Sequence, residues 1–154
     1  MAPKVIRADI QDLPKILELQ YLAYQSEAAL FGDPNIQPLT ETLEELEAEY
    51  RRGTVLKMVT DDGTIIGSVR SYSAGGTTYI GKLMVHPDFR HKGFGTILIQ
   101  KIEEASDDSR YELFTSTRSL NNIRLYEKLG YRKFKEERAT EKIVFVYLEK
   151  NALK

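Results

Sequence analysis

The apolar positions in the N-terminal third of the chain recur with helical spacing. A short apolar run at 5–8 predicts a strand, and a helical face follows it. That face consists of Leu13, Ile16, Leu17, Tyr21 and Tyr24. A second helix is expected over 42–53, where Thr42 and Glu45 match a capping box. Residues 31–38 contain two prolines, a glycine and an asparagine, and they predict the loop between the two helices.

The middle of the chain changes to a pattern typical of strands. Residues 55–60, 64–72 and 77–85 are rich in β-branched and aromatic side chains. The short sequences DDG at 61–63 and AGG at 74–76 separate them and resemble hairpin turns. These segments therefore predict three consecutive antiparallel strands.

The C-terminal half alternates between helix and strand. The expected elements are a helix at 95–105, a strand at 112–117, a helix at 123–129 and strands at 131–137 and 142–149. A helix between two strands favours a parallel pair, so the sheet should be mixed. The fold class is α+β with α/β character: a mixed sheet of six to seven strands with about four helices.

Length and composition fit one globular domain spanning residues 1–154. Hydrophobic residues make up 42% of the chain, charged residues make up 29%, and the net charge is −1. That balance gives no electrostatic reason to expect a nucleic-acid or membrane partner. The absence of cysteine excludes disulfides, thiolate metal sites and a cysteine nucleophile, and two histidines make a histidine-rich metal site unexpected. No metal is therefore predicted.

The N-terminal sequence MAPKVIRADI contains no apolar segment of the kind that signal peptides carry. Nor does any apolar run in the chain approach the length that a membrane-spanning helix needs. We therefore expect a cytoplasmic protein.

The sequence RHKGFGT at 90–96 lies between the strand ending at Val85 and the next predicted helix. The first turn of a helix has unpaired backbone amides and partial positive charge, and both favour an anion. Gly93 and Gly95 have no side chain to keep a ligand away from these amides. The neighbouring basic residues are Arg90, His91 and Lys92. This combination predicts a phosphate-binding loop.

Two common nucleotide-binding motifs do not fit this loop. A P-loop requires GxxxxGK followed by Ser or Thr, which the sequence lacks. A dinucleotide-binding loop requires a third glycine where this chain has Leu98. A turn that simply caps a helix remains the structural alternative.

The wider sequence resembles the GCN5-related N-acetyltransferase (GNAT) family in two motifs. The first is a strand ending in Leu-x-Val followed by Arg-x-x-Gly-x-Gly; its residues here are Leu83, Val85, Arg90, Gly93 and Gly95. The second lies in a late helix, with Leu125, Tyr126, Gly130 and Tyr131. The motifs are about 30 residues apart, and the order of elements is similar to the family fold along nearly the whole chain.

The resemblance implies a single acetyltransferase domain that uses acetyl-CoA. Amides near 91–96 would hold the pyrophosphate, and the pantetheine arm would lie where the strand before the loop splays from its parallel neighbour. The implied cofactor-binding residues are Leu83, Met84, Val85, Arg90, His91, Lys92, Gly93, Phe94, Gly95, Thr96, Asn121 and Tyr126.

The implied reaction is direct acetyl transfer from the thioester to the primary amine of a small molecule. The resemblance assigns Tyr126 as general acid toward the CoA thiolate, because a phenol is protonated at neutral pH. It also assigns the backbone amide near Val85 as a donor to the thioester oxyanion. The structural alternative for Tyr126 is a core residue of its helix.

Two positions depart from the family pattern. Many members carry a carboxylate where this chain has Gly81, so the general base could be a water chain or another carboxylate such as Glu27. Glu27 could equally be a solvated surface residue. The family often has asparagine at the position of Ser119, and either Ser119 or Asn121 could contact pantetheine. His86 could also be considered as a base, but it is more easily explained as a structural residue.

The acceptor is expected to contact the segment between the first two helices, the third and fourth strands and the turn at 138–142. The candidate substrate-binding residues are Tyr24, Glu27, Tyr72 and Tyr79. Glutamates at 41, 44, 45, 47 and 49 could attract a cationic amine or form a solvated helix face. A small acceptor is favoured because no extra module is available to recognise a protein.

Three alternatives stay open at this point. The acceptor could be a protein or peptide amine, the chain could be a non-catalytic CoA-binding regulatory module, or the loop could bind another phosphate compound. Family habit also allows a homodimer, formed through the apolar last strand.

Overall fold

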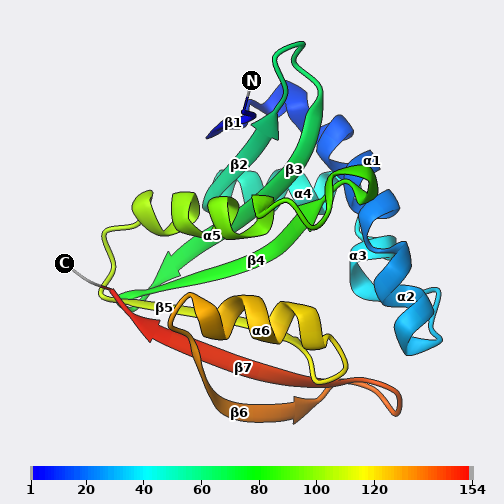
Figure 1. Ribbon diagram of the computed structural model, residues 1–154, viewed down its shortest axis with the longest axis vertical. Coiled ribbons are helices and arrows are strands. Elements are labelled where there is room, and N and C mark those ends of the chain that lie inside the picture. The colour runs from blue at the N-terminus through cyan, green and yellow to red at the C-terminus, as the bar shows by residue number, and fades with distance from the viewer. Residues whose placement is uncertain (1, 153–154) are drawn as a thin grey trace.

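A seven-stranded mixed sheet organises the computed structural model, which describes residues 2–152 (Figure 1). The strands are β1 (Lys4–Arg7), β2 (Thr54–Val59), β3 (Ile65–Ala74), β4 (Thr77–Val85), β5 (Arg110–Ser116), β6 (Arg132–Arg138) and β7 (Val144–Asn151). Their order is β1-β2-β3-β4-β5-β7-β6. β4 and β5 are parallel, and the other neighbouring strands are antiparallel. The predicted mixed sheet with one parallel pair is confirmed.

The helices include all four that the sequence predicts. The α-helices are α1 (Leu13–Ala23), α2 (Gln25–Phe31), α3 (Gln37–Thr40), α4 (Leu43–Arg52), α5 (Phe94–Glu104) and α6 (Leu120–Lys128). The predicted helices correspond to α1, α4, α5 and α6, while the short helices α2 and α3 are additions that the sequence pattern does not predict. Single 3-10 turns lie at Ile10–Asp12 and Pro87–Phe89.

The segment between α1 and α4 is more helical than its composition suggests. The predicted loop at 31–38 is correct only in part, because α2 continues through Phe31 and α3 begins at Gln37. Pro38 does not break a helix, since it lies in the first turn of α3, where the lost amide has no intrahelical partner. Tyr24, expected within the first helix, forms the bend between α1 and α2.

Local chemistry explains several of the element boundaries. The Thr42 side chain accepts a hydrogen bond from the Glu45 amide at 3.2 Å, and the Glu45 carboxylate accepts one from the Thr42 amide at 2.9 Å. This confirms the capping box at the start of α4. Between β3 and β4, Gly75 and Gly76 both have positive φ, which a tight two-residue hairpin requires.

Helices cover the two faces of the sheet (Figure 1). α5 and α6 lie on one face, where Leu98, Ile99 and Ile102 of α5 pack in the largest hydrophobic cluster. α1 and α4 lie on the other face over the N-terminal strands, around a second cluster that includes Ile16 and Leu46. A third cluster joins Phe31 and Ile36 to Ile143, next to β7. The second face above β4 and β5 is therefore bordered by helices on one side and by the β6–β7 turn on the other.

The position of β7 constrains how copies of the chain could associate. β7 is hydrogen-bonded to β5 on one side and to β6 on the other, so it cannot pair by its edge with a second molecule. The exposed strand β6 forms that edge of the sheet instead. A homodimer through the last strand stays a prediction, and it would have to use a face of β7 and not its edge.

Candidate functional site

β4 and β5 separate soon after they begin. Their parallel pairing covers Thr77, Thr78 and Tyr79 of β4, and no later pair joins the two strands within the described residues. Figure 1 shows the strands starting together and then diverging. The edge of β4 facing this gap can accept another extended chain in place of β5. The predicted splay is confirmed.

The first cavity, called here the α5 cavity, lies where β4 ends and α5 begins. It is formed by the end of β4, the loop before α5, the C-terminal end of α1 and the start of α6. The predicted cofactor residues that line it are Leu83, Met84, Val85, Arg90, His91, Gly93, Phe94, Gly95, Thr96 and Asn121. Lys92 is exposed and is not among the lining residues, and Tyr126 lines the other cavity.

The two loop glycines have different structural roles. Gly93 is the N-cap of α5 and has a positive φ, and nothing lies within 4 Å of a Cβ built on it. Gly95 lies within the helix, and its Cβ would be 3.3 Å from Leu125 Cδ2. The expectation that a missing side chain leaves the amides open therefore fits Gly93, whereas Gly95 allows close packing between α5 and α6.

Two of the basic residues near the loop have structural contacts. Arg90 Nη2 donates a hydrogen bond to the Ala23 carbonyl oxygen at 2.8 Å, which connects the loop to the end of α1. His86 Nδ1 accepts one from the Asp88 amide at 3.1 Å and supports the turn after β4. The cations missed by the sequence analysis are Arg118 and Arg124, which also line the α5 cavity.

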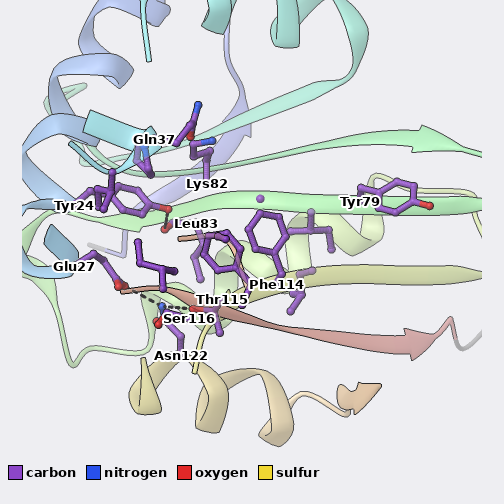
Figure 2. Close-up of a pocket in the computed structure, with 18 of the residues that line it drawn as sticks. Tyr24, Glu27, Gln37, Tyr79, Lys82, Leu83, Phe114, Thr115, Ser116 and Asn122 are labelled. Atoms are coloured by element: carbon purple, nitrogen blue, oxygen red, sulfur yellow. Dashed lines mark hydrogen bonds between the residues drawn. The ribbon is translucent and has the colours of Figure 1, made fainter. Parts of the chain in front are cut away.

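The second cavity, called here the β4–β5 cavity, has a volume of about 710 Å³ (Figure 2). It is lined by α2, α3, α4 and α6, the strands β3, β4, β5 and β7, and the turn before β7. The four predicted substrate-binding residues, Tyr24, Glu27, Tyr72 and Tyr79, all line it. The rings of Tyr72 and Tyr79 stack with centroids 5.0 Å apart. The residues that add aromatic surface are Phe114, Phe145 and Tyr147.

The two cavities share four lining residues: Tyr24, Glu27, Leu83 and Asn122. The Tyr24 hydroxyl donates to the Leu83 carbonyl oxygen at 3.2 Å (Figure 2). Burial, with smaller contributions from the charges of nearby groups, raises the pKa of Tyr24, so this donor stays protonated. We call these four residues the junction.

Glu27 is not a freely solvated carboxylate. Its Oε2 accepts a hydrogen bond from Ser119 Oγ at 2.9 Å, and its Oε1 accepts one from Asn122 Nδ2 at 3.2 Å. Both donors are neutral, and no cation lies within ion-pair distance of Glu27 in the described part of the chain. The Glu27 side chain is therefore held in place at the junction.

Tyr126 is a buried residue of α6 and lines the β4–β5 cavity. Burial and the negative charge of Glu27 raise the pKa of its phenol. The position fits both earlier interpretations, because the side chain belongs to the main core cluster and also faces a cavity.

Ser119 and Asn121 occupy different environments. Ser119 is buried and its hydroxyl is bonded to Glu27, whereas Asn121 is exposed and lines the α5 cavity. The geometry favours Asn121 as the residue available to a ligand, and this stays a prediction.

A buried polar cluster underlies one side of the β4–β5 cavity. Arg70 Nη1 lies 3.1 Å from Glu41 Oε1 and 2.8 Å from Glu49 Oε2, and Arg70 Nη2 donates to the Gln20 side chain. Glu41 precedes α4 and is 3% exposed, so its assignment to an acidic, solvated helix face is wrong. Sequence analysis missed Arg70. The signal that could have revealed it is a basic residue at an inward-facing position of β3.

The described residues contain no group of three or more His, Cys, Asp or Glu side chains that could hold a metal ion. None of the helices in residues 2–152 is long and apolar enough to cross a membrane.

Comparison with known proteins identifies a matching family. The sequence profile of the acetyltransferase (GNAT) family matches residues 14–131. The Bacillus subtilis UPF0157 protein YqkA is 27% identical over 128 residues; the match covers 82% of this chain and 36% of that protein, so the chain spans about a third of its length.

Solved structures support the same fold. The Escherichia coli ribosomal-protein-S18-alanine N-acetyltransferase superposes with a TM-score of 0.79 at 14% identity, covering 97% of this chain and 93% of that one. The Thermoplasma acidophilum PaiA N-acetyltransferase, solved with coenzyme A, has a TM-score of 0.78 at 19% identity, covering 99% and 100%. A Sinorhizobium meliloti phosphinothricin acetyltransferase, solved with AcCoA, has a TM-score of 0.77 at 14% identity, covering 98% and 89%. The chain belongs to the acetyltransferase (GNAT) family.

Proposed function

We propose that this chain transfers the acetyl group of acetyl-CoA directly to a primary amine of a small molecule. The observation that carries the proposal is the junction of the two cavities beside the gap between β4 and β5. One cavity has the features of a phosphate site, and the other has the volume and lining of a small-molecule site. Two substrates could therefore meet at Tyr24, Glu27, Leu83 and Asn122.

The α5 cavity suits the pyrophosphate end of CoA. Unpaired amides in the first turn of α5 and its partial positive charge favour an anion. Gly93 leaves space above these amides, while Arg118 and Arg124 add positive charge at the rim. The CoA and AcCoA complexes of the Thermoplasma and Sinorhizobium proteins, which share the fold, support this assignment.

The gap between β4 and β5 suits the pantetheine arm. Leu83 and Val85 of β4 line the α5 cavity beyond the last paired residues. An extended arm with two amide groups can hydrogen-bond to the free edge of β4 as an added strand would. The reactive thioester would then lie near the junction.

The chemistry follows from the groups around the junction. The Glu27 carboxylate takes a proton from the acceptor ammonium, and the neutral amine nitrogen then bonds to the thioester carbon. The amide of Val85 stabilises the negative oxygen formed in that step. The carbon–sulfur bond breaks, and the Tyr126 hydroxyl gives a proton to the departing thiolate. The second proton of the attacking nitrogen then passes to the Tyr126 phenolate as the amide forms. The raised pKa of Tyr126 keeps the phenol protonated before the step.

The β4–β5 cavity supports a small acceptor. Its volume of about 710 Å³ falls within the range of small-molecule sites, roughly 300–1,000 Å³. The turn before β7 and the α2–α3 segment both line it.

A thiol-release assay tests the proposal. The chain has no cysteine, so a thiol reagent would report only the CoA produced. Acetyl-CoA is incubated with a panel of amines, amino acids and lysine-containing peptides, and product masses are measured. We expect a gain of one acetyl group on a small amine. Acetylation of peptides alone would contradict the small-acceptor assignment, and failure with every acceptor would contradict acetyl transfer.

A further inference from the structure

An irregularity in β4 changes the direction of the Lys82 side chain. Gly81 pairs with Arg70 of β3 and Met84 pairs with Ser68, so Lys82 and Leu83 together lie opposite Val69. Lys82 has a positive φ, which is unusual for a lysine and characteristic of bulges that redirect a side chain. The bulge places Lys82 among the residues that line the β4–β5 cavity.

The Lys82 ammonium has no close counter-ion within the described residues, since no carboxylate oxygen lies within 4.0 Å of it. Burial lowers its pKa; the negative charge of Glu41 opposes this effect, and the positive charge of Arg70 adds to it. A half-buried cation without a contact partner is unfavourable unless a ligand supplies one.

Arg70, which also lines the β4–β5 cavity, uses its terminal nitrogens within the protein. Its side chain is buried, with the residue 4% exposed, and its two terminal nitrogens bond to Glu41, Glu49 and Gln20. Its Nε is buried and has no hydrogen-bond partner among the described residues. Buried donors are nearly always paired, so this nitrogen is an exception within the cluster, but it has almost no accessible surface and is not placed to contact a ligand.

The opposite charge lies across the cavity. Figure 2 shows Glu27 and Lys82 on opposite sides of the hydrogen bond between Tyr24 and Leu83. Glu27 accepts hydrogen bonds from neutral donors, so its charge is not cancelled by them. A carboxylate on one side and an ammonium on the other are complementary to a zwitterion.

The neighbouring surface is apolar and aromatic. Phe114 is 49% exposed, and its ring centroid lies 4.8 Å from that of Phe145 and 5.2 Å from that of Tyr147. All three residues line the β4–β5 cavity. Exposed rings inside a cavity gain stability when an apolar group covers them.

We propose that the acceptor is an α-amino acid with an apolar side chain. Its ammonium group faces Glu27, its carboxylate faces Lys82, and its side chain covers Phe114 and Phe145. This inference rests on the proposed acetyl transfer and names its substrate class. In this step one ammonium proton goes to Glu27, the carbon–nitrogen bond forms, the carbon–sulfur bond breaks and Tyr126 protonates the thiolate. The second proton of the nitrogen restores the Tyr126 hydroxyl.

The test compares each amino acid with the amine that lacks only its carboxylate. The probes are L-phenylalanine against phenethylamine, and L-leucine against 3-methylbutylamine, with kcat/KM measured by thiol release. We expect the amino acid to exceed its amine by about tenfold or more, the value of a charge-assisted hydrogen bond. Lys82→Met should bring the ratio of kcat/KM between each amino acid and its amine close to one. Lys15→Met, at an exposed position on α1, should leave this ratio unchanged.

Separate outcomes distinguish the two proposals. If phenethylamine reacts as well as L-phenylalanine, the amino-acid inference is overturned while acetyl transfer stands. If nothing is acetylated, calorimetry on the CoA-loaded chain decides: binding of L-phenylalanine that Lys82→Met abolishes supports the site alone. Lack of such binding overturns it. Should Lys82→Met fail to fold, the comparison of acid and amine on the native chain still decides.

Discussion

The two cavities are built in different ways. The α5 cavity draws nearly half of its lining from one continuous stretch of chain, from Leu83 to Thr96, and it presents backbone amides. The β4–β5 cavity collects side chains from α2, α3, α4, α6 and four strands, and it presents aromatic rings and charges of both signs. A site made of backbone can hold a common co-substrate in any sequence that keeps the loop. A site made of scattered side chains sets which acceptor is chosen.

The largest effect should come from closing the α5 cavity. In Gly93→Glu, a carboxylate replaces open space beside the first-turn amides, at a positive φ that strains a side chain. We expect the Kd for acetyl-CoA, measured by calorimetry, to rise by about a hundredfold or more. Gly63→Glu is the matched control, with a similar positive φ and open space in the β2–β3 turn. Equal effects in both variants would mean that backbone strain, and not the loop, weakens binding.

Removing the Tyr126 hydroxyl should affect turnover and leave binding intact. General-acid catalysis contributes about 10²–10⁴ in rate, so Tyr126→Phe should lower kcat by that order while the Kd for acetyl-CoA is unchanged. Because the pKa of Tyr126 is raised, ionisation of this group should not reduce native activity in mildly alkaline solution. Tyr50→Phe on α4 serves as the control. Full activity in Tyr126→Phe would restrict this residue to a role in the core.

The buried cluster beside the β4–β5 cavity should matter for stability. Arg70→Met leaves Glu41 buried without its cation, which costs about 3–5 kcal/mol of unfolding free energy in comparable cases. Urea denaturation measures the loss, and Arg132→Met, at an exposed arginine, should cost little. A small loss for Arg70→Met would show that water reaches Glu41.

The same cluster predicts a pH dependence. Burial raises the pKa of Glu41, but the Arg70 charge and the Gln20 hydrogen bond lower it more, so its folded-state pKa lies below the ordinary value. Its contribution to stability is therefore present above the unfolded pKa of about 4.3 and is lost as the pH falls through the folded pKa. Unfolding free energy measured in this acid range should fall less steeply in Glu41→Gln. If the unfolding free energy falls equally steeply with pH in Glu41→Gln and in the native chain, Glu41 does not contribute to the pH dependence.

The smallest effect should come from Gly81→Ala. Gly81 lines the β4–β5 cavity, and nothing lies within 4 Å of a Cβ built there. The unfolding free energy should change by no more than about 1 kcal/mol. The acceptor KM should change while the Kd for acetyl-CoA does not. A change in acetyl-CoA binding alone would mean that the cavities are not divided as described.

The sequence predicted the features whose signals are local. The loop at 90–96 can be recognised because its glycines and cations are adjacent, and the α4 capping box needs only Thr42 and Glu45. The hairpins follow from short glycine turns. Pro38 contributed to the partly wrong prediction of a loop over 31–38, because the effect of a proline depends on whether the proline lies inside a helix or in the first turn of one.

The features that were missed depend on distant contacts. Glu27 meets Ser119 and Asn122, more than 90 positions later, and the Arg70 cluster joins residues from α1, β3 and the start of α4. No single stretch of sequence contains these pairs. The bulge that redirects Lys82 also depends on how β4 pairs with β3, which a strand pattern alone does not reveal.

The most direct test of the central claim is a crystal structure of the chain with CoA bound. We predict the pyrophosphate at the first turn of α5, the pantetheine between β4 and β5, and the thiol sulfur at the junction of Tyr24, Glu27, Leu83 and Asn122. That result would join the two cavities into one catalytic path. CoA bound with its sulfur outside the junction, or with the gap between the strands unoccupied, would contradict the account.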